Sequence, residues 1–115
     1  MNVCIIGDGL TSLSLAKNLL NEKINVHIYH KNKVQNLSSN RTIGISKNNL
    51  EFFNNEIYKI PKKNYWEIKK IEIYSEKLGR ENILKFENNK NNLFYMVKNN
   101  ELYKLLKKKI SKNKF

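Results

Sequence analysis

The chain has 115 residues, of which 40% are hydrophobic and 10% aromatic, so it can fold around one modest core but is too short for a two-domain enzyme. Its formal net charge is +12, and 20 of its 22 basic residues are lysine. A nucleic-acid site usually gathers arginine and aromatic residues in one place. The scattered lysines therefore favour a solvated surface, and we expect no nucleic-acid partner.

The first thirty residues have the pattern of a strand, a helix and a second strand. Residues 3–6 are an apolar run that ends at Gly7, and we expect a parallel strand buried on both faces. Apolar residues recur at helical spacing over residues 10–20, which predicts an amphipathic helix. Apolar and polar residues then alternate over residues 25–30, as in a half-buried strand. This order predicts a βαβ unit with two parallel neighbouring strands.

Shorter elements fill the rest of the chain. The expected elements are a polar loop over residues 31–40, a short helix over 47–54, a β-hairpin over 68–87, a short strand over 94–97 and a closing helix over 99–115. Pro61 separates the short helix from the hairpin, and Gly79 is free to take a positive φ in the hairpin turn. The closing helix is expected to bury an apolar face made of Leu102, Leu105, Leu106 and Ile110.

The segment Gly7-Asp8-Gly9-Leu10-Thr11-Ser12 joins the first strand to the first helix. Gly7 allows a tight turn, and Gly9 lets a pyrophosphate approach the backbone. The helix N terminus then offers free N–H groups and the positive end of its dipole. Ser12 stands where the usual fingerprint has a third glycine. Between a strand and an amphipathic helix this pattern predicts a dinucleotide site, with an ordinary βα turn as the alternative.

The fingerprint also expects an acidic residue about 20 residues further on, at the end of the second strand. His30 occupies that position. A neutral imidazole cannot accept two hydrogen bonds from a ribose diol, as a carboxylate can, so we expect the adenosine ribose to bind more weakly or in a different arrangement. Taken by itself, a histidine here is more often a surface residue than a ligand. The sequence offers no paired carboxylates, metal-ligand cluster or activated nucleophile, so no catalytic or metal-binding residue is predicted.

Three segments together carry a resemblance to a known family. They are residues 3–16 around the glycine loop, the segment Arg41-Thr42-Ile43-Gly44-Ile45-Ser46, and residues 94–102 at the start of the last helix. In order and spacing they resemble the FAD-dependent aromatic hydroxylases of ubiquinone biosynthesis, which are p-hydroxybenzoate-hydroxylase-like flavoprotein monooxygenases. The resemblance covers nearly the whole chain but only the start of such a protein. Its more specific part is the Arg-Thr-x-x-x-Ser segment.

The resemblance implies the FAD-binding segment of an enzyme that reduces FAD with NAD(P)H and hydroxylates a polyprenylated phenol. The cofactor-binding residues that it implies are Gly7, Gly9, Leu10, Thr11, Ser12, His30, Lys31, Arg41 and Asn100. Asn100 falls where the family often has an arginine, and His30 replaces the family's acidic residue. These departures predict weak or lost FAD binding.

The expected fold class is α/β, with a Rossmann-type βαβ FAD-binding unit, a β-hairpin and a C-terminal helix as a partial flavoprotein hydroxylase fold. We expect an FAD-binding unit with its following helix over residues 1–60, the start of a substrate-domain sheet over 61–98, and a helix over 99–115 that returns to the FAD-binding part. The resemblance implies that the other strands of that sheet lie outside these residues. The hairpin should therefore leave four apolar residues exposed, namely Ile71, Ile73, Leu84 and Phe86.

A chain of this length is expected to be inactive alone, because it cannot enclose both a flavin and a polyprenyl phenol. Besides FAD, the expected partners are a C-terminal complementing polypeptide or a second copy of the chain, and a peripheral membrane contact stays open. The single cysteine and the absence of a signal peptide or a long apolar run lead us to expect a cytoplasmic protein. The alternatives are a non-catalytic nucleotide-binding module and a basic interaction module derived from such an enzyme.

Overall fold

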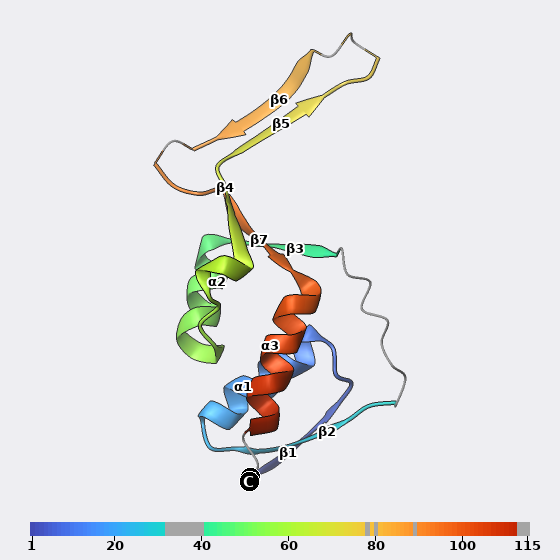
Figure 1. Cartoon of the computed structure of the whole chain (residues 1–115), viewed down its shortest axis with the longest axis vertical. Coiled ribbons are helices and arrows are strands. Elements are labelled where there is room, and N and C mark those ends of the chain that lie inside the picture. The colour runs from blue at the N-terminus through green and yellow to red at the C-terminus, as the bar shows by residue number, and fades with distance from the viewer. Residues whose placement is uncertain (32–40, 78, 80, 89, 113–115) are drawn as a thin grey trace.

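The computed structural model describes residues 1–31, 41–77, 79, 81–88 and 90–112, which form a mixed α/β structure. The molecule is elongated, with extents of 59 × 33 × 23 Å. Figure 1 shows a strand–helix–strand unit at one end of the long axis, a small sheet in the middle and a β-hairpin at the other end. The expected α/β class is confirmed.

The strand–helix–strand unit consists of β1 (Asn2–Ile6), α1 (Leu10–Asn21) and β2 (Asn25–Tyr29). The two strands are parallel, and their register runs from the pair Asn2–Asn25 to the pair Ile6–Tyr29. Residues 22–24 turn the chain from α1 into β2, with Lys23 in the left-handed region at a φ of +59°. The prediction of two parallel neighbouring strands joined by a helix is confirmed.

The expectation that β1 is buried on both faces is wrong. Ile5 is buried and Val3 is half-buried, but Cys4 and Ile6 are exposed, Ile6 to 86%. In the part of the chain that the structure describes, β1 pairs with β2 alone, and the helices lie on one side of this pair (Figure 1). An apolar run predicts two-sided burial only where the sheet has layers on both sides.

The middle of the molecule is an antiparallel sheet in the order β3–β7–β4. Its strands are β3 (Thr42–Ile45), β7 (Phe94–Lys98) and β4 (Tyr65–Ile68). The strand β7 matches the expected strand over residues 94–97, whereas β3 and β4 were not expected. Both are only four residues long, and both pair with β7. The rings of Tyr65 and Tyr95 pack edge to face with their centroids 5.5 Å apart, which joins β4 to β7.

Helix α2 (Lys47–Phe52) begins at Ser46, whose hydroxyl accepts a hydrogen bond from the Asn49 N–H. The helix continues as a π-helical turn over Phe53–Ile57, so the predicted helix over residues 47–54 is present and three residues longer. The side-chain amide of Asn21 on α1 donates to the carbonyls of Glu56 and Ile57 and so satisfies two groups at the end of this turn. A short 3₁₀ turn over Lys62–Asn64 then leads into β4.

The hairpin is formed by β5 (Lys70–Tyr74) and β6 (Asn82–Glu87), and Gly79 in its turn has a φ of +64°. This confirms the predicted hairpin and the role of its glycine. The hairpin projects from the rest of the molecule (Figure 1). Ile73, Leu84 and Phe86 are exposed as expected, whereas Ile71 is half-buried.

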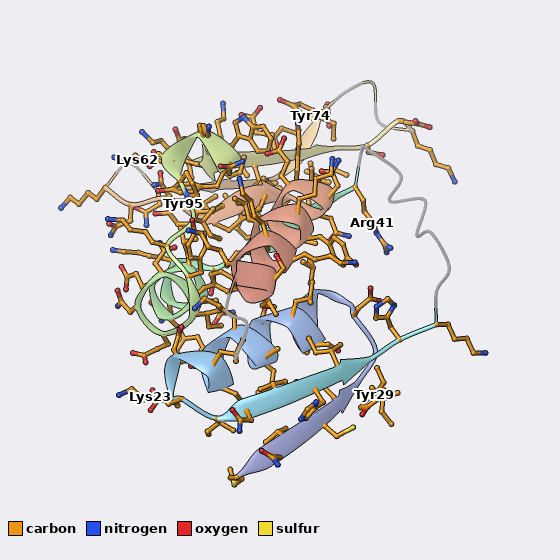
Figure 2. All side chains as sticks on the ribbon, turned by 60° about the horizontal axis from the view of Figure 1, so that its bottom comes forward. Lys23, Tyr29, Arg41, Lys62, Tyr74 and Tyr95 are labelled. Carbon is orange, nitrogen blue, oxygen red and sulfur yellow. The ribbon has the colours of Figure 1, made fainter. Side chains whose placement is uncertain are left out.

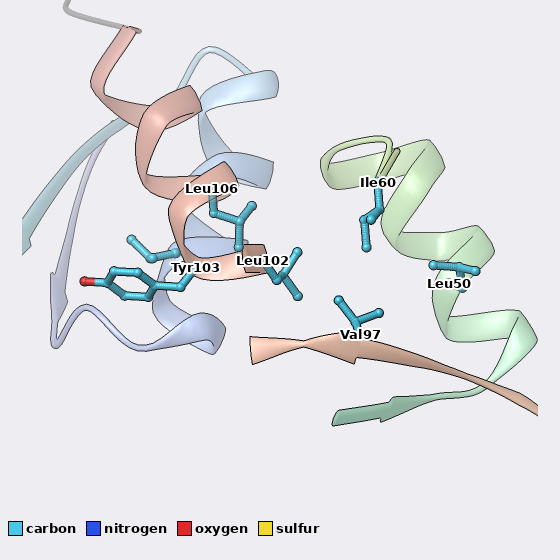
Figure 3. Packing of buried hydrophobic residues seen from close by; sticks show 7 residues of the cluster. Leu50, Ile60, Val97, Leu102, Tyr103 and Leu106 are labelled. Carbon is cyan, nitrogen blue, oxygen red and sulfur yellow. The ribbon is translucent and has the colours of Figure 1, made fainter. Parts of the chain in front are cut away.

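The last helix, α3 (Asn99–Lys112), packs against α1 and lies between the strand–helix–strand unit and the middle sheet (Figure 1). Figure 3 shows Leu102 of α3 facing Val97 of β7 and Ile60, whereas Tyr103 points to the other side of the helix. The core residues are Leu13, Leu50, Ile60, Val97, Leu102, Tyr103 and Leu106. Burial of Leu102 and Leu106 confirms the prediction, but Leu105 and Ile110 are only half-buried. One continuous core therefore fixes α3 relative to α1.

Candidate dinucleotide site at the glycine loop

The glycine loop, residues 7–12, runs from the carboxyl end of β1 into the first turn of α1. Gly7 has a φ of +108°, a backbone conformation that residues with a Cβ rarely adopt. Its N–H donates to the carbonyl of Tyr29 at 2.8 Å, which extends the β1–β2 ladder by one step. The chain therefore leaves the sheet in a sharp turn that favours glycine.

Helix α1 presents its N terminus at this loop. Its first backbone hydrogen bond runs from the Leu13 N–H to the Gly9 carbonyl at 2.9 Å, and the N–H groups of residues 10–12 precede it. Gly9 caps the helix in an extended conformation and has no side chain to cover these groups. Among the residues that the structure describes, none beyond its chain neighbours lies within 4 Å of a Cβ built on Gly9. The N–H groups, the dipole and this open space fit a diphosphate.

Ser12 packs against the turn as the third small residue of the loop. Its Oγ lies 3.6 Å from the position of a Cβ built on Gly7, an ordinary van der Waals separation. Serine therefore fits beside the turn where the usual fingerprint has glycine, and the close approach of helix to strand is retained.

A group of polar side chains that the sequence did not predict surrounds Asp8. The Tyr103 hydroxyl donates to Asp8 Oδ2 at 2.8 Å, and Lys107 Nζ lies 3.8 Å from the same oxygen. His30 Nδ1 lies 3.7 Å from it, and the Asp8 side chain is 13% exposed. We call Asp8, His30, Tyr103 and Lys107 the Asp8 cluster. It joins the glycine loop, the end of β2 and α3.

Lys107 is bound within this cluster as well. Its Nζ donates to the Tyr103 hydroxyl at 3.1 Å and lies 5.3 Å from the centre of the Tyr103 ring. The pKa of Lys107 is raised above its ordinary value, mainly by the hydrogen bond to Tyr103, with a smaller contribution from the charge of Asp8. The spacing of four residues places Tyr103 and Lys107 on one face of α3, but no sequence pattern points from that face to Asp8.

The remaining predicted residues lie at the ends of β2, β3 and α3. His30 and Lys31 follow β2 and are exposed, and His30 belongs to the Asp8 cluster. Arg41 precedes β3, and its carbonyl accepts a hydrogen bond from the Asn99 N–H at 2.9 Å. This bond brings Arg41 to the start of α3, where Asn100 is half-buried in the first turn. Figure 2 shows the Arg41 side chain projecting toward the layer formed by β1 and β2.

A cavity of about 200 Å³ lies elsewhere, beside the turn that precedes β7. Its walls are polar, and its lining residues are Lys47, Glu67, Lys69, Asn88, Lys90, Asn91, Asn92 and Tyr95. None of the predicted site residues contributes to it. Three lysines and three asparagines match the overall composition of the chain, so we assign no chemistry to this cavity.

Among the described residues, no three histidines, cysteines or acidic residues are grouped so that they could hold a metal ion. No helix in the described ranges is long and apolar enough to cross a membrane.

No protein-family model matches the sequence, and no curated protein matches it. Solved structures do match the fold. A putative FAD-containing monooxygenase from Photorhabdus luminescens subsp. laumondii TTO1 is 20% identical with a TM-score of 0.69, and the match covers 97% of this chain and 29% of that one. Klebsiella pneumoniae HpxO, in complex with FAD and uric acid, is 16% identical with a TM-score of 0.72, over 95% of this chain and 28% of that one.

A third match is 2,6-dihydroxypyridine-3-hydroxylase from Arthrobacter nicotinovorans, which is 17% identical with a TM-score of 0.65. The match covers 91% of this chain and 25% of that one. The chain thus spans less than a third of the length of each of these proteins. At this level of identity the likeness concerns the fold, and the chain has the fold of one part of FAD-containing monooxygenases.

Proposed function

We propose that the chain is the FAD-binding segment of a flavin-dependent monooxygenase, with the cofactor's diphosphate at the glycine loop. The observation that supports this most directly is the N terminus of α1, where a Cβ built on Gly9 would meet no atom of the described residues within 4 Å. It lies at the carboxyl end of a parallel strand, in a fold that FAD-containing monooxygenases share. An ordinary βα turn would need neither this open space nor the glycine there.

Each predicted residue has a place in this proposal. Gly7 and Gly9 let the backbone approach the diphosphate, and the N–H groups of Leu10, Thr11 and Ser12 donate to it. His30 and Lys31 lie where the adenosine ribose would bind. Arg41 and Asn100 approach the cofactor from the starts of β3 and α3. The division into parts over residues 1–60, 61–98 and 99–115 belongs to the same proposal.

Bound FAD would supply the oxygen chemistry, and the residues of this chain bind and orient it. We place the segment in an enzyme that takes electrons from NAD(P)H and hydroxylates a polyprenylated phenol in ubiquinone biosynthesis, in the cytoplasm. The remainder of such a fold, on the same or a separate polypeptide, would complete the flavin site. The 115 residues alone should therefore catalyse no substrate-dependent hydroxylation, which an NADPH-oxidation assay coupled to detection of the hydroxylated phenol measures.

Gly9→Ser gives a sharp test of the diphosphate site. Ser46 at the start of α2 has nearly the same backbone conformation as Gly9, and its hydroxyl accepts from the backbone of the following turn. A serine at position 9 should likewise cap α1 and so leave stability equal or higher. It would also occupy an N–H group that the phosphate needs, so FAD affinity should fall in a flavin-fluorescence titration. Unchanged affinity would favour the ordinary βα turn.

A further inference from the structure

We propose that Tyr103 and Lys107 are positioning residues for the phosphate site, and that they act by holding and neutralising Asp8. The inference rests on the proposed dinucleotide function. These contacts would allow the loop to bind the diphosphate although Asp8 carries a negative charge at its centre.

Asp8 poses a problem for a phosphate site. It stands between the two glycines that would lie under the diphosphate, and two residues before α1 begins. A carboxylate beside a helix N terminus is stabilised by the dipole and accepts hydrogen bonds from the first N–H groups, as a phosphate does. A fixed negative charge there also repels a second anion. An unconstrained Asp8 would therefore compete with the ligand for the same end of α1.

Two contacts of Asp8 connect it to α3. The hydrogen bond from Tyr103 at 2.8 Å directs the carboxylate toward α3, and the ammonium group of Lys107, at 3.8 Å, opposes its charge. With Asp8 only 13% exposed, the pair is less screened by water than a pair on the open surface. Tyr103 thus holds the Asp8 carboxylate by a hydrogen bond, and Lys107 partly neutralises its charge.

The position of Tyr103 is itself fixed by the core. Tyr103 is 7% exposed and packs within the cluster that contains Leu102 and Leu106. Lys107 is held over its ring and by its hydroxyl. The packing of α3 against α1 therefore positions both side chains next to Asp8.

Each substitution should change FAD affinity in a defined direction. Lys107→Met leaves the Asp8 charge unopposed, so FAD affinity should fall by about two- to fivefold, the range expected for an ion pair near a protein surface. Asp8→Asn keeps an acceptor for Tyr103 and removes the charge, so its affinity should equal or exceed that of the wild type. The double variant should recover the affinity that Lys107→Met loses. Lys108→Met removes an exposed charge one residue along α3 and serves as the matched control.

The experiment is a flavin-fluorescence titration of FAD with the wild type, the three variants and the control. The proposal is supported if Lys107→Met weakens FAD binding in the wild type but not in the Asp8→Asn background, because a direct Lys107–phosphate contact or a general loss of structure would weaken binding in both. A double variant as weak as Lys107→Met overturns it, and so does an equal loss in Lys108→Met.

A second measurement needs no ligand. Amide hydrogen exchange of residues 7–12 should accelerate in Tyr103→Phe relative to Lys108→Met, because Tyr103→Phe removes the hydroxyl that holds Asp8. Exchange at the control's rate in these residues overturns the positioning role. If the wild type binds no FAD, the proposed function fails, and the exchange experiment still decides whether α3 holds the loop.

Discussion

The N–H of Gly7 donates to the carbonyl of Tyr29 at 2.8 Å, so the glycine loop begins as a continuation of the β1–β2 ladder and turns away within one residue. The positive φ of Gly7 makes this change of direction. The geometry of the loop is thus set by the sheet before any ligand is bound.

Gly7→Ala should therefore destabilise the fold by about 1–2 kcal/mol, the usual cost of a Cβ in the left-handed region of the backbone. Among the described residues the Cβ meets Ser12 alone, at 3.6 Å, so the cost comes from the backbone and not from a clash. Urea denaturation of the variant and the wild type measures the difference. Gly9→Ser is the control, since Gly9 has an extended backbone. Equal stability of Gly7→Ala and the wild type would contradict this account of the turn.

His30→Glu should strengthen FAD binding, because a carboxylate accepts from both ribose hydroxyls and a charge-assisted hydrogen bond contributes about 1.5–3 kcal/mol. Asp8 lies 3.7 Å from His30 and would repel the new carboxylate. The gain should therefore be larger in an Asp8→Asn background. FAD titrations compare the wild type with His30→Glu, and Asp8→Asn with the double variant. Equal or weaker binding by the proteins with Glu at position 30 would count against a cofactor role for this position.

Protonation of Glu101 at acidic pH should lower the free energy of unfolding. The Asn64 amide donates to its carboxylate at 2.9 Å, and this bond, aided by Lys98, lowers the pKa of Glu101. The unfolded chain then binds the proton more tightly than the folded chain, so stability rises with pH through this range. The contribution is complete above the ordinary pKa of a glutamate and is lost as the pH falls through the lowered value.

Asn64→Ala should make stability depend less on pH in the acidic range, because it removes the main cause of the lowered pKa of Glu101. Urea midpoints of the two proteins from neutral to acidic pH give the comparison. Glu51→Gln serves as the control, since the ion pair that Glu51 forms with Lys47 is exposed to solvent. An unchanged pH dependence in Asn64→Ala would show that the bond does not couple protonation to folding.

The hairpin should make the isolated chain self-associate. Ile71 pairs with Phe86 and Ile73 with Leu84, so the four side chains lie on one face of β5 and β6. In the described part of the chain no third strand joins this pair. Phe86→Lys should shift the protein toward monomer in sedimentation velocity, more than Ile83→Lys, which lies outside the two facing pairs. A wild type that stays monomeric at high concentration would contradict the prediction.

The sequence predicted the elements whose signal is local. The apolar run before Gly7, the helical leucines and the alternation around Val26 sufficed for β1, α1 and β2 because each pattern is complete within a few residues. Strands β3 and β4 were missed because each is four residues long and takes its identity from pairing with β7, some thirty to fifty residues away. Their existence is a property of the assembled sheet.

The candidate site divides in the same way. The glycines and Ser12 follow from spacing, since their task is to shape the backbone next to a helix. The Asp8 cluster could not be predicted, because Tyr103 lies 95 residues from Asp8 in the sequence and meets it only when α3 packs on α1. Two-sided burial of β1 was predicted wrongly for a related reason: an apolar residue such as Ile6 does not reveal which layers are present.

The outward face of β1 also carries Cys4, the single cysteine of the chain, in an exposed position. A maleimide dye would therefore attach at one known point, on the side of the sheet opposite the helices. Any polypeptide that covers this face would slow the labelling, whereas one that binds only the hairpin would not. The rate of thiol modification at Cys4 therefore reports whether a binding partner covers this face of β1.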